Sequence, residues 1–532
     1  MSIFSKLHYI SRLSAAVFLM LSFLCACSHD NTDLSVFPDF TAEKYINLNI
    51  VVSAGSEGGT RAMTRGDGED SGSTAASSIE DGDGRELGSV RESTVKGITL
   101  MLYHDEAGIN TQDDETKIDF VKYYPVELTD ETASDCPYPN NIEAVYTTGE
   151  QLLGADFDLT KEYHAIVVAN LDLTGTVAVG SSLKTIVENI KPGVRDRVID
   201  KIYTGGGIGV DATDFVMSLE DSNNEIINFA NVTPERNGNK LVYNFDNIRI
   251  ERLAARVDFW MKNATYNDDC EGYEYKVWRA SDTNTPTSSD RFVLTAVTPF
   301  NLYNGDEYLF KRINDGGAIK YLGDENTGSY VIDPKTKDKT LVQTSPLYYD
   351  NTLASLINED NQNHTLVGKA DFCQLTKKLH SDMEKYKEDP TYKTQWVSFQ
   401  DDGGYDNFIL CYPKENTLKD DSPLYYYATG VAIEGDYYKD GVEEPEHRIY
   451  YGYLRHQREP LENGASTYSI KMAKDLEVAK EQEKAGAEGV AMNFGVVRNN
   501  IYRISIDKIT EQGELRIEVK KWDPFTHSTI YM

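Results

Sequence analysis

The sequence has 532 residues and a formal net charge of -33 at pH 7. This length exceeds what one hydrophobic core usually serves, so we expect at least two domains. The acidity argues against nucleic acid as a partner, because such binding depends on neutralising phosphates with lysine and arginine. It also argues against binding to anionic lipid through a basic face. Tyrosine is frequent, at 34 residues, which favours strands and an all-β fold.

The chain begins with the features of a lipoprotein signal peptide over residues 1–26. Lys6 and Arg12 precede an apolar run, 13–24, that is too short to remain as a membrane-spanning helix, and small residues precede Cys27. We therefore expect export, cleavage before Cys27, and lipid attachment to its sulfur and amino group. The alternative is an ordinary secretory signal with chance cysteines. Either signal takes the protein out of the cytoplasm.

The first strand of the mature chain is expected over residues 45–52. Apolar and polar residues alternate there, as in a half-buried strand; the apolar set is Ile46, Leu48, Ile50 and Val52. Residues 55–93 follow, rich in Gly, Ser, Asp and Glu, and predict a flexible, protease-accessible loop. This loop contains Arg61 and Arg65. A strand followed by a loop that can be cut suggests a removable strand.

Beyond this loop, the pattern predicts two β-rich regions with minor helical insertions, at residues 95–262 and 263–506. Strands are expected around residues 98–102, 165–169, 247–259, 292–297, 424–433 and 447–454, and helices over 181–200, 371–388 and 472–487. Two amphipathic strands follow, one over 502–506 and one with the apolar positions Leu515, Ile517 and Val519, before Trp522. The last strand either pairs within its own sheet or fills an open sheet edge on another molecule.

Motifs for catalysis or metal binding are missing from the sequence. It contains neither His-Glu-x-x-His nor Gly-x-Ser-x-Gly, so we expect no enzyme activity and no cofactor. Residues 205–209 lack the Lys-Ser/Thr end of a phosphate loop and predict a turn, and residues 81–84 lack the later ligands of a calcium loop. His447 and His456 are expected at solvated surface positions. The remaining cysteines are expected to be structural, with one or two disulfides left open: Cys136, Cys270, Cys373 and Cys411.

Segments along almost the whole chain resemble, in order, the fimbrillins of type V pili, and within that family the shaft subunits of minor fimbriae. The segments are the lipobox at Cys27, the first strand with Thr60-Arg61-Ala62 after it, residues 251–257, and residues 496–506 followed by a short strand and Trp522. The stretch Arg498-Asn499-Asn500-Ile501-Tyr502 is the most specific of them. It is the combination in this order that carries the resemblance.

The resemblance implies two transthyretin-like, Greek-key β-sandwich domains in tandem and a precursor anchored to the outer membrane by lipid. In this family an arginine-specific protease cuts after the first strand, and the groove that opens is filled by the C-terminal strand of a neighbouring subunit. Mapped here, the cut follows Arg61, or else Arg65, and removes residues 27–61 with the first strand. Residues 62–94 then form an acidic linker, and residues 507–532 supply the donor positions, which are Leu515, Ile517, Val519 and Trp522.

The resemblance also implies the partners of the chain. They are other fimbrial subunits, joined head to tail, the arginine-specific protease, and the outer membrane through the lipid. The chain would then be a structural subunit of a cell-surface fimbria that supports adhesion to an unidentified target.

Two alternatives stay open at this stage. One is a tip or anchor subunit of such a fimbria, and the other is a monomeric lipid-anchored protein that binds glycan. The tyrosine-rich stretch 425–438 would be the candidate sugar platform, although tyrosines at strand spacing more often pack against their neighbours. Polymer formation separates these functions, because a glycan binder stays monomeric after trimming.

Overall fold

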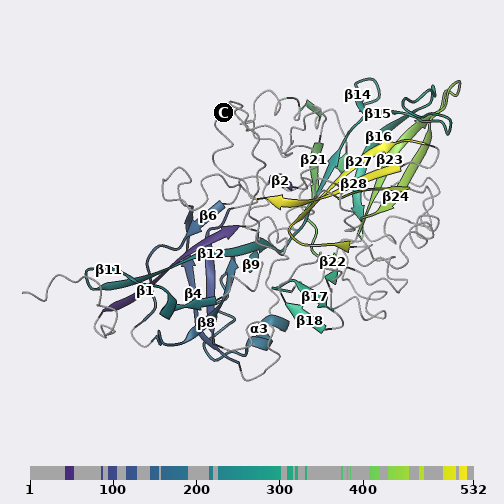
Figure 1. The fold of residues 1–532 in the computed structure, drawn as a ribbon. Helices are drawn as coiled ribbons and strands as arrows, with labels where there is room; N and C mark the ends of the chain where they lie inside the picture. Colours follow the sequence, from purple (N-terminus) through teal and green to yellow (C-terminus); the bar gives the residue numbers. More distant parts are fainter. Residues whose placement is uncertain are drawn as a thin grey trace, which may run out of the picture.

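The computed structural model of the chain is built mainly of strands (Figure 1). The described residues are 42–52, 85–87, 94–104, 116–128, 144–154, 157–189, 215–219, 226–300, 308–315, 318–321, 330–331, 373–374, 380–381, 384, 407–417, 429–454, 466–471, 495–510 and 514–523. The predictions for residues 81–84, 205–209 and 472–487, and for Cys136 and His456, lie outside these residues. The all-β fold class is confirmed.

The largest sheet takes its strands from residues 43–252 and is called the N-terminal sheet below. Its strands are β1 (Glu43–Val52), β3 (Gly97–Tyr103), β4 (Ile118–Pro125), β5 (Glu127–Leu128), β6 (Ala144–Thr147), β7 (Gln151–Leu152), β8 (Glu162–Ala169), β9 (Met217–Leu219), β10 (Ile226–Asn228), β11 (Glu235–Asn237) and β12 (Lys240–Arg252). Within the described residues it is an 11-stranded sheet with the order β4-β3-β8-β9-β12-β1-β6-β5, and β7, β10 and β11 pair with its members.

A second sheet, called the C-terminal sheet, has 6 strands within the described residues. They are β2 (Arg85–Leu87), β13 (Arg256–Trp260), β21 (Asn407–Cys411), β25 (Ser466–Lys471), β27 (Asn500–Lys508) and β28 (Glu514–Asp523). Their order is β2-β28-β27-β13-β21, with β25 paired to β28. The C-terminal sheet therefore combines late strands with one short strand, β2, from the beginning of the chain.

A third sheet, called the distal sheet, lies farthest from β1 in Figure 1. It consists of β14 (Thr265–Asn267), β15 (Gly272–Lys276), β16 (Arg291–Phe300), β20 (Cys373–Gln374), β23 (Gly430–Tyr438) and β24 (Glu446–Tyr453). Smaller sheets are formed by β17 (Arg312–Asp315), β18 (Ala318–Tyr321) and β19 (Tyr330–Val331), and by β22 (Asn416–Thr417) with β26 (Gly495–Val496). The helical elements include α3 (Leu183–Asn189) and the 3-10 turn η3 (Phe229–Asn231).

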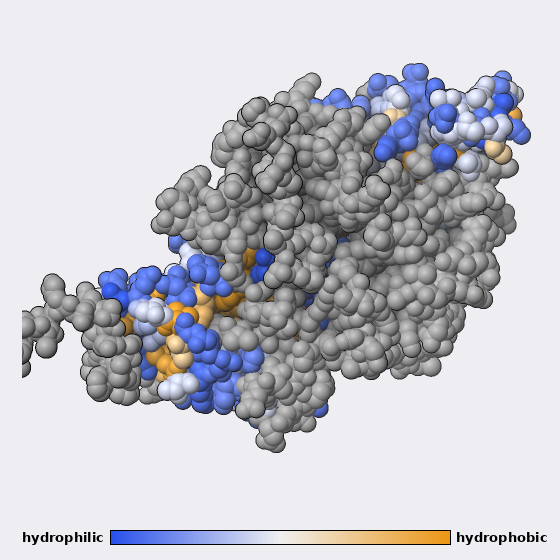
Figure 2. Space-filling model, in the orientation of Figure 1, coloured by the Kyte–Doolittle hydropathy of each residue, from blue (hydrophilic) through white to orange (hydrophobic). Residues whose placement is uncertain are grey.

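Buried apolar side chains of all three sheets form one connected core. It extends from Ile46 in β1 through Phe292 in β16 to Ile509 after β27. In Figure 2 the apolar residues visible on this face gather over the N-terminal sheet, with hydrophilic residues around them. The division into domains at residues 95–262 and 263–506 stays a prediction, because the core itself is continuous.

Most predicted strands are confirmed where the structure describes them. The expected strands over 45–52, 98–102, 165–169, 292–297, 447–454 and 502–506 lie in β1, β3, β8, β16, β24 and β27. Leu515, Ile517 and Val519 lie in β28. The helix predicted over 181–200 is present as α3, and its residues 190–200 lie outside the described part. Of the strand predicted over 424–433, residues 430–433 lie in β23, which continues to Tyr438, and residues 424–428 lie outside the described part.

The single long strand predicted over 247–259 is wrong, because it is divided at residues 253–255 into β12 and β13. At the division, the backbone N–H groups of Leu253 and Ala255 donate to the carbonyls of Val216 and Pro413, at 3.0 and 2.9 Å. These two bonds lead to different parts of the chain. The segment therefore leaves the N-terminal sheet and enters the C-terminal sheet at this point.

The helix predicted over 371–388 is also wrong at its start. Cys373 and Gln374 form β20, which pairs with Val297 and Ala296 of β16. Sheet pairing with a strand distant in sequence overrides the local helical pattern here.

Candidate functional site

Strand β1 occupies an inner position of the N-terminal sheet. It pairs in parallel with β12, in a register that begins with Glu43 opposite Lys240 and ends with Val52 opposite Ile250. Along its other edge it pairs antiparallel with β6 and β7. The first strand of the mature chain therefore has hydrogen-bonding neighbours on both sides.

The apolar side chains of β1 fill the core beneath this position. Ile46, Leu48, Ile50 and Val52 are all fully buried, as their alternation predicts. Burying one such side chain contributes about 1.5–3 kcal/mol relative to leaving it in water. The pairing register shifts between Leu48 and Ile50, and Val51 beyond this irregularity is buried too.

The opposite face of β1 carries a polar ladder that fixes its register. The Asn47 amide donates to Asn244 Oδ1 at 3.0 Å and its Oδ1 accepts from the Thr147 hydroxyl at 2.8 Å. The Asn49 amide donates to Asp246 Oδ1 at 2.5 Å. If β1 were withdrawn, the position would retain two unpaired strand edges, an apolar floor and these polar partners. Such a position can accept another strand with alternating side chains.

The predicted donor residues lie elsewhere, in β28 of the C-terminal sheet (Figure 1). Leu515, Ile517 and Val519 pair with Ile506, Ile504 and Tyr502 of β27 in an antiparallel register. On the other edge, the same part of β28 pairs with β25, and Trp522 pairs with Glu86 of β2. The structure thus places the predicted removable strand and the predicted donor strand in two different sheets of one chain.

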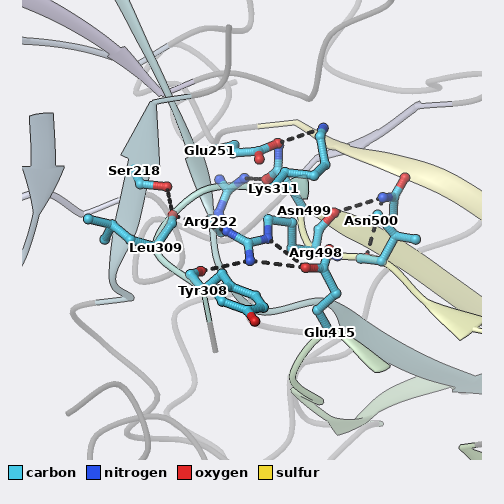
Figure 3. Close-up of polar contacts among 11 residues, drawn as sticks. Ser218, Glu251, Arg252, Tyr308, Leu309, Lys311, Glu415, Arg498, Asn499 and Asn500 are labelled. Atoms are coloured by element: carbon cyan, nitrogen blue, oxygen red, sulfur yellow. Dashed lines mark hydrogen bonds and ion pairs between the residues drawn. The ribbon is translucent and has the colours of Figure 1, made fainter. Parts of the chain in front are cut away.

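A buried polar junction connects these two sheets (Figure 3). We use this name for the side chains and carbonyls that meet where β12 ends and β27 begins, which are Ser218, Glu251, Arg252, Tyr308, Leu309, Lys311, Glu415, Arg498, Asn499 and Asn500. The charged members are almost completely buried. Buried charges are tolerated only where they are paired and hydrogen-bonded. We therefore expect the stability of the fold to depend on these contacts.

Arg498 is the centre of the polar junction. Its Nη2 donates to Glu415 Oε2 at 3.0 Å and to the carbonyl of Tyr308 at 2.9 Å, and its Nη1 donates to the carbonyl of Leu309 at 3.2 Å. The hydroxyl of Ser218 in β9 donates to the same Leu309 carbonyl. The guanidinium thus joins its own segment to two others that are distant in sequence, at residues 308–309 and at Glu415.

Asn499 and Asn500, which follow Arg498, make different contacts. Asn499 has a positive φ of 56°, a backbone conformation that asparagine tolerates better than most residues. Its Oδ1 accepts from Arg252 Nη1 at 3.0 Å, and its N–H donates to the Ala254 carbonyl at 2.9 Å. The Asn500 amide closes the turn on the Arg498 carbonyl at 2.8 Å. Two of the segments that carry the resemblance, 251–257 and 496–506, therefore meet in space.

Further buried charges hold β12 and β13 in place. Glu251 pairs with Lys311 at 3.3 Å, with both side chains almost fully buried. In β13, Arg256 makes two hydrogen bonds to Asp258, at 2.9 and 2.7 Å. The motif residues Arg252 and Arg256 are suggested by the sequence, whereas Glu415 and Lys311 are not, because no local pattern singles them out.

The expectation that His447 is a solvated surface residue is wrong. Strand pairing places it opposite Asp436, and its ring nitrogens lie 3.1 Å from Asp436 Oδ1 and 3.0 Å from Glu434 Oε1. The hydrogen bonds to Asp436 and Glu434 raise the pKa of His447 to about 9, against the opposing effect of burial. His447 therefore carries a positive charge at neutral pH.

This pairing predicts a loss of stability at alkaline pH. The folded-state pKa lies above the unfolded value, so the stabilisation is fully present below pH 6.5 and is lost as the pH rises through about 9. We expect a loss of about 1–2 kcal/mol, allowing for solvent screening of this half-buried group. Urea unfolding between pH 6 and 9.5 measures it. His447→Gln should be less stable at pH 6 and should lack this part of the pH dependence; an unchanged pH profile would contradict the assignment.

The tyrosine-rich stretch is in part internal. Tyr437 is buried, its hydroxyl donates to Asp290 Oδ2 at 2.8 Å, and the guanidinium of Arg448 lies 3.4 Å from its ring centroid. Burial and the hydrogen bond to Asp290 raise the pKa of Tyr437 to about 12. This side chain packs within the distal sheet rather than forming a sugar platform.

Several predicted site residues lie outside the described residues. These are Cys27, Arg61 and Arg65. Cys270 is half-buried with a free thiol, and Cys411 is buried. In the described part of the chain, no helix has the length and apolar character needed to cross a membrane, and no cluster of His, Cys, Asp or Glu is arranged to hold a metal ion.

No protein-family model matches the sequence, and no curated protein matches it. Among solved structures, the chain is similar to the tip fimbrial protein Mfa3 from Porphyromonas gingivalis with a C-terminal truncation, at 11% identity and a TM-score of 0.37, covering 90% of this chain and 100% of that one. A fimbrilin (fimA) from Porphyromonas gingivalis W83 has 11% identity and a TM-score of 0.37, covering 92% and 100%.

A fimbrial assembly protein from Parabacteroides distasonis ATCC 8503 has 10% identity and a TM-score of 0.29, covering 89% of this chain and 94% of that one.

Proposed function

We propose that this chain is a structural subunit of a cell-surface fimbria that polymerises by exchanging strands after β1 is removed. The observation that carries the proposal is the position of β1. It is an inner strand with two neighbours, its apolar side chains fill the core, and the segment after it contains Arg61 and Arg65. An inner strand that can be cut away leaves a slot for a replacement.

In this mechanism the precursor is exported as a lipoprotein and is held at the outer membrane through Cys27. An arginine-specific protease cuts after Arg61, or after Arg65, and β1 departs with the lipid. The slot between β12 and β6 then accepts β28 of another copy, with Leu515, Ile517 and Val519 replacing the apolar side chains of β1. Main-chain hydrogen bonds supply affinity, and the alternate side chains supply specificity.

The exchange breaks and forms a similar number of strand pairings. In its own sheet, β28 has β27 on one edge and β25 with β2 on the other. In the slot, a strand has β12 on one edge and β6 with β7 on the other. The incoming strand thus regains two neighbours, while β27 and β25 lose their shared one. Filling the apolar slot, which would otherwise be open to water, must offset that loss.

The contact between copies joins two different surfaces, the slot of one subunit and β28 of the next. A heterologous contact of this kind continues into an open filament when its rotation does not close a ring. This supports the role of a shaft subunit within a fimbria that serves adhesion. A tip or anchor subunit would need only one of the two surfaces.

The proposal is tested by treating the purified precursor with an arginine-specific protease. We expect a new N-terminus at Ala62 or Gly66 and, in the same sample, SDS-stable ladders of subunits. N-terminal sequencing and gel electrophoresis read the two results separately. A chain that is cut there but stays monomeric would overturn the shaft function in favour of a tip, an anchor or a glycan-binding protein.

A further inference from the structure

The short strand β2 crosses between sheets. Residues 85–87 lie between β1 and β3, both strands of the N-terminal sheet, yet they pair in parallel with Lys521–Asp523 of β28 in the C-terminal sheet. Figure 1 shows β2 beside the end of β28. Of the described strands that precede β13, β2 is the one that joins the C-terminal sheet.

Together, β2 and β25 cover the outer edge of β28. Strand β25 pairs with residues 514–519, and β2 pairs with residues 521–523. An uncovered strand edge is a template for pairing with another chain. The coverage therefore prevents β28 from adding to a foreign sheet while it remains in its own.

The position of β2 on β28 also determines how β28 can leave. Residues 509–513 connect β28 to β27 at residue 514, so we expect separation from the sheet to start at the other end of β28. That end, Lys521–Asp523, is where β2 pairs. A strand that peels away from this end must first lose β2.

We propose that β2 is an internal latch on the donor strand, an inference that rests on the proposed function of β28. A cut after Arg61 or Arg65 separates β1 from β2 but leaves β2 joined to β3 through residues 88–96. The latch therefore remains on the processed subunit. It delays donation until an acceptor slot is available, and three paired residues form a contact weak enough to be displaced.

Proline at the centre of β2 tests the latch. Glu86→Pro removes a backbone N–H and disfavours the extended ladder, while Gly82→Pro places proline in the same connecting segment before β2. After protease treatment, we expect Glu86→Pro to form ladders about tenfold faster than the wild-type chain, with Gly82→Pro unchanged. Equal rates for Glu86→Pro and the wild type would overturn the latch.

A reversible crosslink gives the opposite test. Glu86 and Trp522 are paired across the two strands, so the double variant Glu86→Cys, Trp522→Cys can be oxidised to lock β2 on β28. We expect the oxidised form to be cut normally but to yield at least tenfold fewer ladders, with recovery after reduction. Each single cysteine variant is the control, and normal assembly of a chain whose crosslink is verified by mass spectrometry would overturn the latch.

Hydrogen exchange in the uncut precursor separates this inference from the proposed function. Glu86→Pro should raise deuterium uptake in peptides covering residues 514–523, whether or not the chain polymerises. Faster exchange with no ladders from any variant would mean that β2 covers β28 but that β28 is not donated to another copy. That result would overturn both the proposed function and the latch. Wild-type ladders with unchanged exchange would leave the proposed function standing and overturn the latch alone.

Discussion

Replacing both Arg61 and Arg65 by alanine is expected to abolish the cut before Ala62 or Gly66 and to leave the precursor monomeric after treatment with an arginine-specific protease. The physical reason is the buried state of β1. While it stays covalently attached, its apolar side chains occupy the slot, and an attached strand competes at millimolar effective concentration. We expect ladder formation to fall at least a hundredfold, as measured by quantitative gel electrophoresis.

The single variants identify the cut. Arg61→Ala alone should move the new N-terminus to Gly66 if Arg65 can substitute, and Arg65→Ala alone should leave it at Ala62. Arg91→Ala changes an arginine nearer β3 and should assemble as the wild type does. Ladders from an uncut double variant would show that β1 removal is not required, and the slot would lose its proposed role.

Replacing Arg498 by methionine is expected to lower the free energy of unfolding by about 3–5 kcal/mol, the usual effect of removing one partner from a buried ion pair. The carboxylate of Glu415 would remain buried without its guanidinium, and the carbonyls of Tyr308 and Leu309 would lose their hydrogen bonds from Arg498. Urea unfolding, followed by circular dichroism, measures the change.

Two further variants separate the ion pair from simple loss of a side chain. Adding Glu415→Leu to Arg498→Met removes the uncompensated carboxylate and should restore part of the lost stability. Lys240→Met breaks an exposed pair with Glu150, 2.8 Å apart, and should change stability little. A stability loss for Arg498→Met no larger than that for Lys240→Met would contradict the role of the polar junction.

Local pattern was sufficient to predict the strands that matter for the site. Alternation at Ile46, Leu48 and Ile50 correctly predicts a strand with one buried face, because side chains in a strand point to opposite faces. The same pattern in β28 predicts its existence. Alternation could not tell which strands would be neighbours, since pairing depends on contacts between residues far apart in sequence. The pairing of β2 with β28 is of this kind.

The polar junction, too, could be predicted from the sequence only in part. Arg498 and Asn499 stand out in the sequence as part of a resemblance, but their partners do not. Glu415 lies 83 residues before Arg498, and Lys311 lies 60 residues after Glu251. The continuous strand predicted over 247–259 failed for the same reason, because the change of sheet at Leu253–Ala255 is determined by distant carbonyls.

Mixing two complementary variants tests strand exchange between copies most directly. The acceptor is a protease-treated chain that ends at Gly513 and lacks β28, and the donor is Arg61→Ala, Arg65→Ala, which keeps β28 but retains β1. Circular dichroism verifies that each is folded. We expect an SDS-stable dimer of one acceptor with one donor, and no larger species. Two folded variants that stay monomeric when mixed would contradict donation of β28 into the slot of β1.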